Sequence, residues 1–181
     1  MRRAIAAVAV LTVLVWASPA QQGQDKKDTK DEPTALEKQL LELVNKEREK
    51  EKLPPLKFNA ALYRAARDHS ANMAKKNQMN HFLDGKGPVE RTQAVGYVFK
   101  HIGENVGESD GFPPPVIVQG WMNSKIHRDN ILKPQYTEIG LGAVRGTRGW
   151  TYYTQLFGTP RMAATAPPKV EPPAKDGNST R

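Results

Sequence analysis

The order of the predicted secondary-structure elements indicates an α+β fold. Patterns typical of helices fill most of the first part of the globular region, and patterns typical of strands mostly fill the second part. A βαβ series would alternate the two, so a doubly wound parallel sheet is not expected. The chain has 181 residues and no cysteine, which excludes thiol catalysis, thiolate metal sites and disulfide bonds.

The helical region is predicted from two N-caps and from apolar spacing. Thr34 and Glu37 have the spacing of a capping box, and leucines recur behind them at helical intervals. Asn59 is the predicted N-cap of a second helix, on whose apolar face His69 is expected to be a hydrogen-bonded core residue. Shorter helices are expected over residues 89–95 and 116–124.

Three stretches have the composition of strands, namely residues 98–106, 138–144 and 150–157. The last is rich in aromatic residues and threonine, and Tyr152, Tyr153 and Phe157 are expected to be only half buried. Residues 145–149 contain two glycines and can turn the chain, so the last two strands are predicted to form an antiparallel hairpin.

The N-terminus has the features of a secretory signal peptide, which we predict over residues 1–20. Arg2 and Arg3 precede a mainly apolar run, and small residues stand before the expected cleavage site. The apolar run is shorter than the roughly 20 residues that a membrane-spanning helix needs. We therefore expect a secreted or periplasmic protein without a transmembrane segment after cleavage.

The remaining chain is predicted to hold one domain over residues 34–159. Residues 21–33 are polar and are expected to be a disordered linker, and the Pro/Ala-rich residues 160–181 a disordered tail. The formal net charge is +8, but the charges alternate in sign over residues 46–52 and form no basic stripe. Nucleic acid is therefore not an expected partner.

Six short motifs follow one another along the predicted domain. They are NHFLDG with His81, Arg91 to Tyr97, Gly-Glu-Asn with Glu104, GWMNS..HR.NIL with His127, EIGLG from Glu138, and YTQLFG over residues 153–158. In this order they resemble the CAP superfamily, also called the SCP domain, and in particular its bacterial exported branch without cysteines. The resemblance spans residues 34–158 and implies an α-β-α sandwich with a small, mostly antiparallel sheet between helical layers.

The resemblance also implies a surface cavity where two histidines and two glutamates converge, and where some members bind zinc or another divalent ion. His81 and Glu104 match the first histidine and the first glutamate. Ser124 stands at the place of the second glutamate, and the motif that supplies the second histidine is absent. His127 and Glu138 are therefore the candidates for the two remaining positions, which gives four candidate metal ligands.

Residue spacing alone does not require a metal, because the four candidates are dispersed and no HExxH motif is present. His81 and His127 could equally hydrogen-bond backbone groups at loop corners. Lys125-Ile126 replaces the Pro-Gly that the bacterial pattern usually shows, which leaves the preceding helix free to continue. On this interpretation His127 is a polar corner residue whose ring can face the cavity.

These observations predict an exported module that binds an envelope or extracellular ligand through a His/Glu-lined cavity, with Zn²⁺ or another divalent cation as an optional cofactor. Two alternatives remain open, a metal-assisted hydrolase of peptidase type and a carrier of lipids or sterols. Ser124 lies one helical turn before His127 and could act as a nucleophile, but no G-x-S-x-G motif surrounds it.

Overall fold

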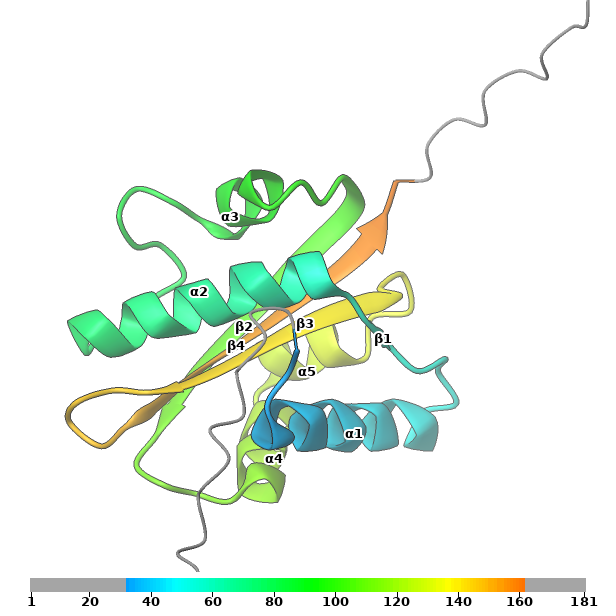
Figure 1. The fold of residues 1–181 in the computed structure, drawn as a ribbon. Coiled ribbons are helices and arrows are strands. Elements are labelled where there is room, and N and C mark those ends of the chain that lie inside the picture. Colours follow the sequence, from blue (N-terminus) through cyan, green and yellow to red (C-terminus); the bar gives the residue numbers. More distant parts are fainter. Residues whose placement is uncertain (1–31, 162–181) are drawn as a thin grey trace, which may run out of the picture.

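The computed structural model describes residues 32–161, which form an α-β-α sandwich (Figure 1). The predicted signal peptide, nearly all of the predicted linker and nearly all of the predicted tail lie outside these residues. The predicted fold class is confirmed. No helix in residues 32–161 has the length and apolar character needed to cross a bilayer.

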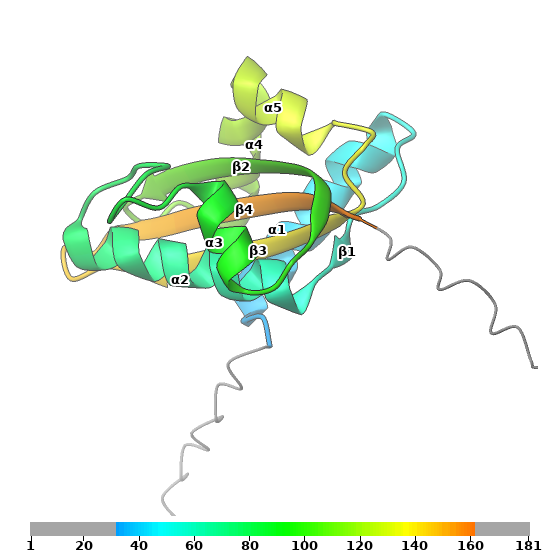
Figure 2. The same cartoon turned by 90° about the horizontal axis from the view of Figure 1, so that it is seen from above.

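The helices are α1 (Ala35–Lys50), α2 (Ala60–Lys76), α3 (Pro88–Ala94), α4 (Pro114–Asn123) and α5 (Lys125–Ile131). The strands are β1 (Lys57–Phe58), β2 (Phe99–Ser109), β3 (Glu138–Arg145) and β4 (Thr151–Pro160), in the sheet order β1-β3-β4-β2. Helices α2 and α3 cover one face of the sheet, whereas α1, α4 and α5 cover the other (Figure 2).

Both predicted N-caps are confirmed. The Thr34 hydroxyl accepts a hydrogen bond from the Glu37 backbone N–H at 3.3 Å, and the Glu37 carboxylate accepts one from the Thr34 backbone N–H at 2.8 Å. The Asn59 side chain accepts hydrogen bonds from the first turn of α2, at 2.9 and 3.1 Å. Each cap satisfies N–H groups that have no partner inside the helix, which fixes where α1 and α2 begin.

The predicted hairpin is confirmed, because β4 pairs antiparallel with β3 along the whole length of β3. Strand β2 pairs antiparallel with β4 on its other side, and the two-residue β1, which the sequence did not predict, pairs parallel with β3. The expectation that Tyr152, Tyr153 and Phe157 are half buried is wrong, because their exposed fractions are 3%, 3% and 0%. Helices cover both faces of β4, so both sets of alternating side chains are buried.

The helix before His127 does not continue through Lys125. Ser124 has extended backbone angles, φ −92° and ψ 118°, so α4 ends there and a separate helix, α5, begins. The Arg128 guanidinium donates to the Met122 carbonyl at 2.9 Å, which satisfies one of the groups left without a partner at the end of α4. His127 therefore belongs to α5 and not to an extension of α4.

Helix α2 packs directly against the backbone of β3. A Cβ atom added at Gly140 would fall well inside van der Waals contact of the carbonyl carbon of Leu62 and the backbone nitrogen of Tyr63. Both neighbours are main-chain atoms that cannot rotate away, and packed interiors have no spare room to absorb the overlap. Glycine is therefore required at this position by the spacing of helix and sheet.

We expect Gly140→Ala to lower the free energy of unfolding by more than about 2 kcal/mol, because the helix must move away from the sheet. The matched control is Gly120→Ala on α4, where an added Cβ meets no atom within 4 Å. There the lower entropy of the unfolded chain should stabilise the protein by about 0.5 to 1 kcal/mol. Urea unfolding of both variants measures the difference, and equal effects would contradict the packing described.

Candidate functional site

The site is built around the carboxylate of Glu104, which lies on β2 with a side chain only 2% exposed. Its Oε1 accepts a hydrogen bond from Nδ1 of His81 at 2.9 Å, and its Oε2 accepts one from Nη2 of Arg91 at 2.6 Å. His81 belongs to the loop after α2, and Arg91 belongs to α3. One carboxylate therefore joins three separate segments of the chain.

Arg91 also positions the backbone of the loop that carries His81. Its Nη1 donates to the carbonyl of His81 at 3.0 Å and to the carbonyl of Lys86 at 2.8 Å. The His81 side chain is 46% exposed, so the ring is anchored at one nitrogen and accessible to solvent. Because a carboxylate only accepts hydrogen bonds, Nδ1 carries a proton and Nε2 is the nitrogen left for a ligand.

A buried amide network holds α5 against the sheet and thereby places His127. Asn105 follows Glu104 on β2 and donates to the backbone carbonyl of His127 at 3.0 Å and to the Gln155 side chain at 2.9 Å. Asn130 donates to the Asn105 side chain at 2.9 Å and to the Glu104 carbonyl at 3.2 Å. These hydrogen bonds therefore fix the position of the α5 segment that carries His127.

His81 affects the imidazole ring of His127 electrostatically. The pKa of His127 lies below the ordinary value, first because burial penalises the charged ring and second because of the positive charge of His81. His127 is therefore a neutral ring at neutral pH, with one nitrogen that donates and one that accepts.

An apolar groove of about 440 Å³ extends from His127 between β2 and α4. Three large apolar side chains of the groove reach solvent, namely Met79, Phe112 and Val116, with exposed fractions of 44%, 58% and 47%. Trp121 forms part of the floor, where its ring lies against Gly107. Ser124 also lines the groove, but no hydrogen bond between its hydroxyl and His127 occurs in residues 32–161.

Glu138 lies apart from this site. Its Oε2 accepts hydrogen bonds from the Tyr97 hydroxyl at 2.7 Å and from the Asn59 side chain at 3.1 Å. Burial, and then Glu138 itself, raises the pKa of Tyr97, so the phenol stays protonated and keeps donating. Strand β4 runs between β3, which carries Glu138, and β2, which carries Glu104. Glu138 thus links α2, β3 and the segment after α3.

The candidate metal ligands are only partly brought together. His81 and Glu104 are hydrogen-bonded to each other, His127 is affected by His81 only electrostatically, and Glu138 does not join them. Each oxygen of Glu104 already accepts a hydrogen bond and the Arg91 guanidinium balances the carboxylate charge, so the role shown for Glu104 is to orient His81. In the part of the chain that the structure describes, no three His, Asp or Glu side chains form a group that could hold a metal ion. The residues present therefore do not fit a three-ligand zinc centre.

The sequence did not reveal the role of Arg91, which we recognised only as part of a motif. A general signal was available, because a buried carboxylate at Glu104 requires a charged or hydrogen-bonding partner. The apolar groove was also missed. Its exposed side chains come from separate segments, and no local pattern shows that they face one concavity.

Comparisons with known proteins agree on one family for this chain. A profile described as the cysteine-rich secretory protein family, abbreviated CAP, matches residues 41–157. The protein YkwD of Bacillus subtilis is 40% identical over 119 residues, which is 65% of this chain and 46% of YkwD. This chain therefore spans about half the length of that relative.

Solved structures agree with the profile. An extracellular protein of Bacillus anthracis that contains a SCP domain has a TM-score of 0.62 at 29% identity, covering 68% of this chain and 40% of that one. An outer surface protein of Borrelia burgdorferi has a TM-score of 0.64 at 22% identity, covering 68% of this chain and 92% of that one. At that identity the second structure supports the fold alone.

We expect Arg91→Met to lower the free energy of unfolding by about 3 kcal/mol, because it leaves the Glu104 carboxylate buried without its guanidinium. Lys125→Met is the control, since its ion pair with Asp129 is solvent-exposed and should contribute at most about 0.5 kcal/mol. In the double variant Arg91→Met/Glu104→Leu most of the loss should be recovered. Additive losses in urea unfolding would contradict a coupled pair.

His127 is expected to titrate below the ordinary histidine value of 6.5. As pH falls through that value, the unfolded chain takes up a proton that the folded protein still excludes. The free energy of unfolding contributed by this residue is therefore complete above the ordinary pKa and decreases on acidification. His81→Asn removes the electrostatic effect of His81 and should raise the pKa of His127 part of the way toward its ordinary value. An NMR titration measures both values, and an ordinary pKa in the parent protein would contradict the burial described.

Proposed function

The chain belongs to the cysteine-rich secretory protein (CAP) family, and we propose that it acts outside the cytoplasm as a ligand-binding module. The groove between β2 and α4 holds the apolar part of the ligand, and His127 hydrogen-bonds to its polar end. Export is supported by the predicted signal peptide and by the Bacillus anthracis relative, which is described as extracellular.

The observation that carries this proposal is the continuity of the apolar groove with a half-buried imidazole. Single exposed apolar side chains are normal on protein surfaces, but several that line one concavity are typical of a binding site. Met79, Phe112 and Val116 line the same groove as His127. An apolar surface with few polar groups at one end is the usual composition of a small-molecule pocket.

The polar end of the groove defines which ligands fit. His127 is neutral at neutral pH, so it offers one donor and one acceptor and no permanent charge. A ligand with an aliphatic or aromatic body and a hydroxyl, amide or carboxyl end would fit both the apolar groove and its polar end. A lipid with such an end group satisfies these conditions, so the lipid-carrier alternative is one form of this proposal.

The proposal predicts that anilinonaphthalene sulfonate, which has an apolar body and one polar group, binds the folded protein and fluoresces. Val116→Asp places a charge in the groove and should weaken binding about tenfold or more. Ile126→Asp is the matched control, because Ile126 is 77% exposed, does not line the groove and also lies in the first turn of its helix. Equal binding by both variants would exclude the groove as the site.

A second candidate function is weak binding of a divalent ion by the two imidazoles, with water completing the coordination. It is favoured by the hydrogen bond to Glu104, which leaves Nε2 of His81 free, together with the electrostatic effect of His81 on His127. In this arrangement Glu104 orients His81 through Nδ1 and does not bind the ion, as is common for the outer partner of a metal-bound histidine.

Zinc titration followed by calorimetry tests the ion site. Binding should be lost in His81→Ala and in His127→Ala and unchanged in Glu138→Gln, because the Glu138 carboxylate is held by Tyr97 and Asn59. Zinc affinity that survives both histidine substitutions would place any ion elsewhere. Dependence on Glu138 would contradict the separation of that residue from the site.

A further inference from the structure

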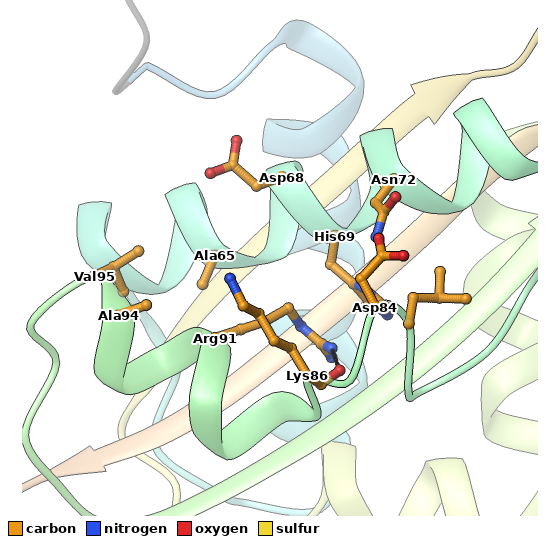
Figure 3. A pocket seen from close by; sticks show the side chains of 10 residues that line it. Ala65, Asp68, His69, Asn72, Asp84, Lys86, Arg91, Ala94 and Val95 are labelled. Atoms are coloured by element: carbon orange, nitrogen blue, oxygen red, sulfur yellow. Dashed lines mark hydrogen bonds between the residues drawn. The ribbon is translucent and has the colours of Figure 1, made fainter.

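A second cavity, of about 310 Å³, lies between α2 and α3 on the opposite layer from the groove (Figure 3). It shares no lining residue with the groove described above. Its walls come from α2, from the loop that ends at α3 and from α3 itself. They include the buried side chain of His69 and the side chain of Arg91, which is 10% exposed, and each has a buried atom with no partner in residues 32–161.

His69 presents an unused hydrogen-bond acceptor. The residue is only 2% exposed, and its Nε2 lies 2.9 Å from the carbonyl oxygen of Asn80. A carbonyl can only accept, so Nε2 carries the proton and Nδ1 carries a lone pair. Burial, and then the charge of Arg91, lowers the pKa of His69, which keeps the ring neutral. The lone pair on Nδ1 has no partner in the described part of the chain.

Arg91, which lines the same cavity, has an unused donor. Its two terminal nitrogens bind Glu104 and the carbonyls of His81 and Lys86, but Nε is buried without a partner in residues 32–161. A buried donor or acceptor without a partner costs about 1 to 3 kcal/mol. A group that donates to His69 Nδ1 and accepts from Arg91 Nε would remove both costs, and a hydroxyl group does both.

The rest of the cavity favours an uncharged ligand with more than one hydroxyl. The charges that line the cavity are balanced, because Asp68 and Asp84 are negative and Lys86 and Arg91 are positive. Asp84 and Arg91 are also held in ion pairs outside the lining, with Lys76 and Glu104, so neither an anion nor a cation is favoured. Asn72 and Asp84, joined by a hydrogen bond of 2.8 Å, offer further polar atoms. The remaining wall is apolar and consists of Ala65, Leu83, Ala94 and Val95.

We propose that the cavity between α2 and α3 is a second ligand site, which binds a small polyhydroxylated molecule such as a polyol or a monosaccharide. One hydroxyl donates to Nδ1 of His69 and accepts from Nε of Arg91. The rim side chains bind further hydroxyls, and the apolar wall contacts the carbon skeleton. This site does not depend on the groove or on its ligand.

The test uses the mature chain labelled with ¹⁵N and long-range proton–nitrogen spectra of the histidine side chains. Glycerol, ribitol and D-glucose are titrated separately. The unliganded protein should show His69 protonated at Nε2 and bare at Nδ1. At least one probe should shift the Nδ1 signal saturably at millimolar concentrations, as expected for a ligand with few heavy atoms.

Ala94→Phe and Ala94→Leu fill the cavity from an exposed position and should each weaken binding about tenfold or more. Val116→Asp blocks only the groove and should bind the probe as the parent protein does, which separates this proposal from the proposed function. Three results would overturn the proposal. The first is a proton on Nδ1 of His69. The second is the absence of a shift with all three probes, which would mean that water alone fills the cavity, and the third is a shift of the Nδ1 signal that survives both Ala94 variants.

Discussion

The pairing of the Glu104 carboxylate with Arg91 and His81 is the interaction on which the rest of the site depends. A carboxylate that is 2% exposed is stable only with charged or hydrogen-bonding partners, and Arg91 supplies the charge. The same guanidinium holds the carbonyls of His81 and Lys86, so it also sets the path of the loop. The direction of the His81 ring therefore follows from one buried ion pair.

Strand β2 connects the two sides of the molecule because neighbouring residues on a strand point to opposite faces. Glu104 faces α3 and binds Arg91, whereas the next residue, Asn105, faces α5 and binds the His127 carbonyl. The sheet between them is buried on both faces, which makes it a rigid support. The groove and the polar cavity lie on opposite sides of this sheet, so each can bind its ligand without blocking the other.

Sequence patterns correctly predicted the features that depend on interactions between residues close together in the chain. The caps at Thr34 and Asn59 and the β3–β4 hairpin depend on residues close in sequence, and all were correct. The burial of β4 on both faces was not predicted, because alternation on a strand does not show what covers each side. The partnership of Arg91 with Glu104 joins α3 to β2, and the separation of Glu138 from Glu104 depends on strand order. Neither has a local signal.

The most direct test of this account is the protonation state of the His81 ring, observed in long-range proton–nitrogen spectra of the folded protein at a pH where the ring is neutral. The account predicts a proton on Nδ1, held by Glu104, and a lone pair on Nε2, with this preference lost in Glu104→Leu. A ring with its proton on Nε2, or one unchanged by that substitution, would contradict the central role of the Glu104 carboxylate.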